Sequence, residues 1–286
     1  DTGRYALQRL SPIFGREAHE DIRAVTEHLA ARGLVTPRLV PAASGALDVE
    51  VDGEVWRLLT WIEGVGLRRL DSPARAEAAG RLLGRFHAAL ADLERPFAHR
   101  RLGVHDTPKH LAALEAALEQ PRDHPRHAAV APLGEAILEA ARQLAPLPRT
   151  PERVVHGDPK LDNLVFAETG EGRALIDLDT VARMPLPLEL GDAFRSWCNR
   201  AGEDAAAPRF DLDLFAGAVR GYFAAAGPRL HPEERAAVVP ATRTIMLELA
   251  ARFCRDALEE RYFGWDPARF ATRGAHQERR ATGQLA

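Results

Sequence analysis

The chain has 286 residues, of which 46% are hydrophobic and 28% charged, a composition typical of a globular protein with one large domain or two. The formal net charge of −3 provides no strong field for nucleic acid or an anionic membrane. The sequence contains no apolar run long enough for a membrane span, no signal-peptide pattern, and only two cysteines, too few for a disulfide framework. These features predict a cytoplasmic protein without nucleic-acid or membrane partners.

Lysine is almost absent from the sequence. Lys109 and Lys160 stand against 36 arginines, and neither has the flanking glycine and Ser/Thr of a Walker phosphate-binding loop, which excludes that motif. The chain also begins with Asp1 rather than methionine, which suggests that a natural N-terminal segment precedes it.

Residues 1–61 predict a small α/β lobe. Its expected elements are a strand at 5–10, a helix at 16–31 and two strands at 46–51 and 54–61. Asp52 and Gly53 separate the last two strands, and Asp-Gly between apolar runs is a strong hairpin signal.

Residues 62–71, with Gly64 and Gly66, are expected to form a linker, and residues 72–286 a mainly helical lobe. A hairpin of two short strands at 164–166 and 174–178 interrupts the helices. Helices are expected at 73–93, from Thr107 onward, and at 189–199, 211–226 and 233–262, the last with a break at Pro240.

The most informative segment is 154–166, which we interpret as a catalytic loop. Asp158 follows an apolar strand, Asn163 comes five residues later, and Asp177 ends the next strand, 174–179. Phosphoryl transfer needs this set of groups. Asp158 would orient the attacking hydroxyl and accept its proton, while Asn163 and Asp177 would supply hard oxygen ligands for Mg²⁺. Lys160 would reach the γ-phosphate.

The structural interpretations of the same residues are more ordinary. An isolated Asp-x4-Asn arises by chance, and His-Gly-Asp can be a simple turn. The His-Gly-Asp turn, the following Asn and the later Asp at the end of a strand together indicate a phosphotransferase much more specifically than any one of them alone. Within it, His156 is expected to be structural, with a ring nitrogen bonded to backbone, and Asp192 to brace the catalytic loop.

The segment resembles the Brenner-type loop of the aminoglycoside phosphotransferase/choline kinase superfamily, in which His-Gly-Asp is followed by Asn. More narrowly, the chain resembles the N-acetylhexosamine 1-kinase-like branch. Shared stretches are 5–9, 25–29, 56–58, 105–107, 176–181, 191–195, 252–256 and 262–263. The resemblance implies an α+β, protein-kinase-like fold of two lobes, with ATP between them and transfer to the anomeric hydroxyl of an N-acetylated hexosamine.

The resemblance also implies residue roles. Asp158 would be the base, and Asn163 and Asp177 the Mg²⁺ ligands, in agreement with the interpretation from spacing. Asp179, Arg252 and Tyr262 would contact the sugar.

Two departures from the family pattern concern the nucleotide. The glycine-rich loop would precede Tyr5, where only three residues before Arg4 are present, and we expect that it is truncated or omitted. No lysine precedes Lys109, so the usual strand lysine is absent; Gln8 and Arg9 occupy its neighbourhood, and Glu20 is expected to pair with Arg9.

The adenine site is expected after the hairpin. Backbone groups of Thr60 and Ile62 would bond the purine edge, with Trp61 as a core residue. Two other functions remain open at this point. One is a kinase for a cationic acceptor such as an aminoglycoside or choline, and the other is a non-catalytic nucleotide-binding pseudokinase. Either way, the expected partner is a small molecule.

Overall fold

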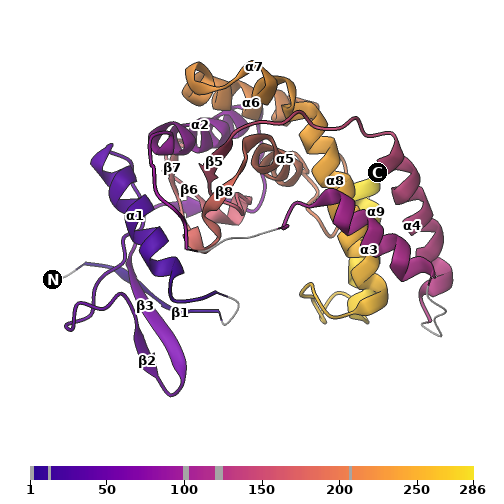
Figure 1. The fold of residues 1–286 in the computed structure, drawn as a ribbon, viewed down its shortest axis with the longest axis horizontal. Helices are drawn as coiled ribbons and strands as arrows, with labels where there is room; N and C mark the ends of the chain where they lie inside the picture. Colours follow the sequence, from indigo (N-terminus) through magenta and orange to yellow (C-terminus); the bar gives the residue numbers. More distant parts are fainter. Residues whose placement is uncertain (1–2, 12–13, 99–102, 120–124, 206–207) are drawn as a thin grey trace.

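The computed structural model describes residues 3–11, 14–98, 103–119, 125–205 and 208–286. A small sheet and one helix form one end of the molecule, and a larger part made mainly of helices, with a few short strands, forms the rest (Figure 1). The elements of the small lobe are β1 (Tyr5–Arg9), α1 (Ala18–Ala31), β2 (Val49–Val51) and β3 (Glu54–Thr60). The antiparallel sheet has the order β1-β3-β2. Residues 1–2, where the expected glycine-rich loop would join, lie outside the described residues.

The hairpin turn between β2 and β3 confirms the Asp-Gly prediction. Asp52 and Gly53 have φ of 52° and 76°, and two positive φ values match the right-handed twist of the flanking strands. Along β3, Arg57 and Leu59 are buried, two residues apart, so they share the inner face of the sheet.

The predicted linker contains a strand that belongs to the large lobe. The short strand β4 (Val65–Gly66) pairs with β6 (Leu164–Phe166), which pairs with β7 (Gly172–Leu175). The chain therefore crosses between the lobes at residues 61–64, and it enters the large lobe beside the catalytic loop.

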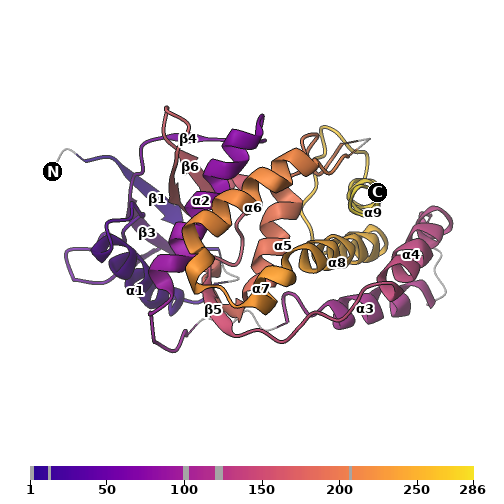
Figure 2. The ribbon, with the colours of Figure 1, turned by 90° about the horizontal axis from the view of Figure 1, so that it is seen from above.

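Helices dominate the large lobe. They are α2 (Pro73–Leu90), α3 (Thr107–Glu119), α4 (His127–Arg142), α5 (Leu186–Trp197), α6 (Leu212–Ala226), α7 (Pro232–Ala236), α8 (Val238–Glu259) and α9 (Arg273–Leu285). Helices α2 and α6 lie side by side (Figure 2). Their backbones are so close that a Cβ added to Gly80 would stand 2.0 Å from the carbonyl oxygen of Ala218. Glycine is thus required where the two helices meet.

Two apolar clusters hold the large lobe together. One joins α2, α5 and α6 to the strands β5 (Glu152–Val155), β6, β7 and β8 (Ala182–Pro185), and the other lies among α3, α4, α8 and α9. The second cluster lies at the end far from the small lobe (Figure 1). The catalytic loop follows β5, so the first cluster fixes its position.

Several elements differ from the prediction. The helix expected at 233–262 is two helices, α7 and α8, and the break lies at Ala237. Pro240 is in the first turn of α8, where its missing N–H costs nothing because first-turn amides have no helical acceptor. The strand β8 and the helices α4 and α9 were not predicted, whereas β5 is the apolar strand expected before His156. Among the described residues, no helix has both the length and the apolarity that a bilayer span needs.

Candidate active site

The catalytic loop bends sharply at Gly157. This residue has φ of +83°, and a Cβ there would stand 2.2 Å from the carbonyl oxygen of Thr180. The hydroxyl of Thr180 donates to the carbonyl oxygen of His156 at 2.8 Å. The loop therefore packs directly on the 3₁₀ turn Leu178–Thr180 that follows Asp177, and only glycine fits at this contact.

A buried carboxylate on α5 braces the loop. Glu189 is 1% exposed, and its two oxygens accept the backbone N–H groups of His156 and Gly157, each at 2.8 Å. Burial opposes its ionisation, but the hydrogen bond with His87 and these backbone donors hold the pKa of Glu189 below its ordinary value. The brace predicted for Asp192 is thus supplied by Glu189, while Asp192 bonds Arg195.

The structural role of His156 is confirmed. Its Nε2 lies 2.9 Å from the carbonyl oxygen of Ile176, and its Nδ1 accepts the backbone N–H of Asp158 at 3.3 Å. A nitrogen that faces a carbonyl must donate and one that faces an N–H must accept, so the ring carries a proton on Nε2. On the other side of the loop, Trp197 donates from Nε1 to the carbonyl oxygen of Pro159 at 2.7 Å.

Asp158 and Lys160 form an ion pair at the tip of the loop. The Lys160 ammonium donates to Oδ2 of Asp158 at 2.6 Å. Burial disfavours the charged amine, but the hydrogen bond to Asp158 and the nearby carboxylates of Asp177 and Asp162 raise the pKa of Lys160. The second oxygen of Asp158 remains available for a ligand, and the loop presents a carboxylate and a cation side by side.

Asn163 and Asp177 are brought together by strand pairing. Leu164 of β6 pairs with Leu175 of β7, and the carbonyl oxygen of Asn163 accepts the Ile176 N–H at 2.9 Å. The Nδ2 of Asn163 donates to the backbone oxygen of Asp158 at 2.8 Å, which leaves its amide oxygen free to act as a ligand. Asp177 has φ of +62°, a strained conformation that is common at functional sites.

The donors at this position suit Mg²⁺. An amide oxygen and a carboxylate are hard ligands, and Mg²⁺ in nucleotide enzymes needs only one or two protein ligands besides phosphates and water. Burial raises the pKa of Asp177, and the neighbouring Asp179 and Asp158 raise it further, so negative charge is concentrated here. A divalent cation would neutralise it.

A cavity of about 430 Å³ lies between the lobes. Thr60 and Ile62 line it at the linker, and Asn163 and Asp177 line it from the large lobe. The structure thus brings the predicted adenine and metal residues to one cavity. Trp61 also lines this cavity and is 45% exposed, with Arg4 over its ring, so its assignment to the core was wrong.

A second cavity, of about 420 Å³, lies inside the large lobe. Asp158 and Lys160 line it, and Asp162 lines both cavities, so both border the catalytic loop. Its walls also include an apolar side, formed by residues of α8 and the following loop, and several neutral polar groups. These residues are Leu249, Phe253, Phe263, Ser196, Asn199 and Gln284.

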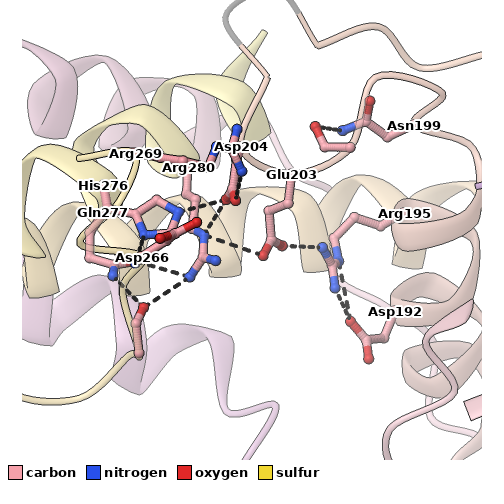
Figure 3. Close-up of polar contacts among 12 residues, drawn as sticks. Asp192, Arg195, Asn199, Glu203, Asp204, Asp266, Arg269, His276, Gln277 and Arg280 are labelled. Atoms are coloured by element: carbon pink, nitrogen blue, oxygen red, sulfur yellow. Dashed lines mark hydrogen bonds and ion pairs between the residues drawn. The ribbon is translucent and has the colours of Figure 1, made fainter. Parts of the chain in front are cut away.

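Ion pairs build the far wall of the second cavity. Glu203 accepts from Arg195 at 2.9 Å and lies 3.6 Å from the Nε of Arg280. Arg280 also bonds Asp204, which accepts from His276 of α9 at 2.7 Å (Figure 3). The network joins α5 and α9 through Glu203 and Asp204, and each of these acids is paired with an arginine.

The predicted Arg9–Glu20 pair is not formed. Arg9 bonds Glu54 across the sheet at 3.2 Å, and Glu20 bonds Arg23 on its own helix at 2.5 Å. Both side chains are exposed. Arg9 points to the outer face of the sheet, and Glu20 lies on the solvent side of α1. Neither is among the described residues that line the cavity.

The residues predicted to contact sugar are not among the described residues that line the second cavity. Asp179 is buried and forms two hydrogen bonds with Arg57, each of 2.6 Å. The guanidinium of Arg252 lies over the rings of Tyr262 and Phe263, and only Phe263 lines the cavity. Tyr262 is 67% exposed.

Sequence reasoning missed Arg57, Glu189 and Glu203. The sequence could have indicated Arg57. It is a charged residue between Val55 and Leu59 on the strand face that is expected to be buried, because side chains two residues apart share a face. Glu189 could also have been identified, because it is an acidic residue between Leu186 and Leu190 on the apolar face of a helix. Glu203 stands in a loop, and no local pattern distinguishes it from a solvated acid.

Comparison with known proteins agrees with this geometry. A model of the phosphotransferase enzyme family matches residues 1–238. This chain belongs to that family. It is 31% identical over 202 residues to a homoserine kinase of Xanthobacter autotrophicus, covering 68% of this chain and 58% of the relative. It is 35% identical over 176 residues to a homoserine kinase of Beijerinckia indica, covering 60% and 51%. The chain thus spans between half and three fifths of the length of these curated relatives.

Solved structures of several kinases and phosphotransferases share the fold of this chain. An amicoumacin kinase bound to AMP-PNP and Ca²⁺ superposes with a TM-score of 0.60 at 15% identity, covering 96% of this chain and 82% of that one. An aminoglycoside phosphotransferase of Alicyclobacillus acidocaldarius gives 0.58 at 17% identity, covering 99% and 85%. A choline/ethanolamine kinase family protein of Mesorhizobium loti gives 0.53 at 16% identity, covering 100% and 88%. These structures confirm the α+β, two-lobed kinase-like fold, and the match to the family model confirms the superfamily. The N-acetylhexosamine branch stays a prediction.

Proposed function

We propose that this family member is a kinase that uses ATP and Mg²⁺ to phosphorylate a hydroxyl group of a small molecule. One observation carries the proposal. Two cavities border the catalytic loop, with Asn163 and Asp177 in the first and Asp158 in the second. A phosphoryl group bound in the first cavity would therefore face a hydroxyl bound in the second.

The side chains supply positioning and charge, which are what phosphoryl transfer requires of a protein. Asp158 orients the acceptor hydroxyl and accepts its proton as the oxygen attacks. Lys160 offers a cation beside the transferring group. Asn163 and Asp177 would hold Mg²⁺, which would neutralise charge on the phosphates. Thr60 and Ile62 supply backbone groups for the purine edge.

A sugar is the first candidate acceptor. Phe253 and Phe263 form a close aromatic pair, with ring centroids 4.5 Å apart, beside neutral polar groups. Such a surface suits the apolar face and the hydroxyls of a pyranose ring. A polycationic acceptor is disfavoured because Glu203, an acid of the wall, is already paired with Arg195 and Arg280.

Homoserine is the second candidate, and it rests on the names of the curated relatives. One feature of the cavity favours it. Arg68 lines the wall, and no acid pairs with it among the described residues, so it is available for an α-carboxylate.

An acceptor panel tests the proposal. ATP consumption is measured with Mg²⁺ and, in turn, N-acetylglucosamine, N-acetylgalactosamine, homoserine, kanamycin and choline. We expect turnover with one acceptor class, and a loss of about 100-fold or more in Asp158→Asn with the fold intact. Asp213→Asn, an exposed acid on α6, is the matched control. ATP binding without turnover of any acceptor would favour a pseudokinase, and equal turnover in Asp158→Asn would refute the mechanism.

A further inference from the structure

The nucleotide cavity contains an arginine from an unexpected strand. Arg57 of β3 is the only lysine or arginine among the described residues that line this cavity. Register places it directly opposite Gln8 of β1, at the place where the sequence lacks the usual strand lysine. A nucleotide triphosphate needs a cation from the protein besides any metal, and among the lining residues Arg57 alone can provide it.

The surroundings of Arg57 hold it rigidly. Its Nη1 and Nη2 donate to the two oxygens of Asp179, each at 2.6 Å, and its Nε and Nη2 donate to Oε1 of Gln8 at 3.2 and 3.0 Å. The side chains of Arg57 and Asp179 are 4% and 9% exposed. A guanidinium has five N–H groups, and four are used, so one N–H of Nη1 is left for a ligand in the cavity.

The helix α1 does not supply the acid that holds this cation. His19 of α1 lies within the electrostatic influence of the pair, and its pKa is lowered by burial and by the charge of Arg57. Glu20, one residue later, is exposed and bonds Arg23. The acid is instead Asp179, from the large lobe, two residues after the proposed metal ligand Asp177.

We infer that Arg57 is the phosphate-binding cation of this kinase, and that Asp179 is a positioning residue that aims its guanidinium. The inference rests on the proposed function. Arg57 reaches the phosphates from the strand that neighbours the usual one, while Gln8 fixes its orientation. Asp179 is thereby committed to the nucleotide side of the site rather than to the acceptor.

Calorimetric titration of adenosine, ADP and ATP in the presence of Mg²⁺ tests Arg57. The variant is Arg57→Met/Asp179→Asn, which removes both charges of the buried pair and leaves neither one unpartnered. We expect ATP and ADP affinity to fall about tenfold or more, the scale of one charge-assisted contact, with adenosine affinity nearly unchanged. Arg16→Ala, which removes an arginine of the small lobe that pairs with Asp48 and Glu50, is the matched control.

The outcomes separate the two proposals. Equal losses for adenosine and ATP would show that the pair is only a structural link between the lobes, and unchanged affinities would show that Arg57 does not touch phosphate. Either result overturns the inference while the proposed function stands. A wild-type protein that binds none of the three ligands would overturn both.

Steady-state kinetics of Asp179→Asn test the positioning role. If Asp179 aims Arg57, the KM for ATP rises and the KM for the acceptor stays the same. If Asp179 contacts the acceptor instead, the acceptor KM rises alone, and the assignment of Asp179 is overturned.

Discussion

At the scale of single residues, the sequence pattern identified the candidate catalytic residues, but it did not identify the residues that support them. Asp158, Asn163 and Asp177 stand in a fixed spacing because two short paired strands must present them together. Glu189 and Arg57 act from positions far along the chain, 32 and 122 residues from their partners Gly157 and Asp179. Such pairings depend on the tertiary fold, which no local pattern encodes.

Gly157→Ala tests how the loop is held. The methyl group would clash with the carbonyl oxygen of Thr180 at 2.2 Å, in addition to the cost of φ of +83°. Gly33→Ala is the matched control, because Gly33 has φ of +76° and no atom near its missing Cβ. We expect about 1 kcal/mol of destabilisation from Gly33→Ala and about 3 kcal/mol from Gly157→Ala, with turnover lost only in the latter. Urea unfolding and kinase assays measure both, and equal effects would contradict the proposed contact.

At the scale of elements, strong local signals predicted the small lobe well. The turn of Asp52 and Gly53 fixed the hairpin, and the apolar spacing of Ile22, Val25 and Leu29 marked the buried face of α1. The helix α9 was missed because its composition is polar, and it is stabilised by ion pairs and by packing on α8 rather than by an apolar stripe. Pro240 misled the prediction because proline is as acceptable in a first turn as it is disruptive later.

The docking of α9 should depend on Asp204. This carboxylate accepts from His276 and Arg280 of α9 and from Arg269 before it. Asp204→Asn leaves three basic groups around an amide, so we expect about 1–2 kcal/mol of destabilisation and faster amide exchange in α9. The matched control is Asp92→Asn, whose carboxylate also has two basic partners but is 67% exposed and screened by water. Hydrogen exchange by mass spectrometry gives the comparison; unchanged protection of α9 would contradict this role.

At the scale of the whole molecule, several contacts set the geometry between the lobes, and two of them border the cavity that the lobes share. The chain enters the large lobe through β4, which joins the sheet that carries the catalytic loop. Across the cavity, Arg57 and Asp179 form a buried ion pair between the lobes. Hairpin and linker patterns are local, so the sequence indicated the small lobe and the linker, while the nucleotide site between the lobes was implied by the family resemblance. It could not reveal which charged residues span that cavity, because this depends on how the lobes pack.

The acid sensitivity of the protein should follow from its buried carboxylates. Burial disfavours the ionised form of Glu189, Asp192 and Glu234. Their basic partners and hydrogen-bond donors nevertheless hold the pKa of each carboxyl group below its ordinary value. Below about pH 4.5 the unfolded chain therefore takes up protons before the folded one, and the free energy of unfolding falls as pH decreases further. Asp177 has a raised pKa and acts in the opposite sense, but it is one group against three.

Urea unfolding from pH 7 to pH 3 checks the sign. Glu234→Gln, which loses the pair with Arg153, should be less stable at pH 7 and show a shallower acid limb; stability that rises toward pH 3 would refute the account.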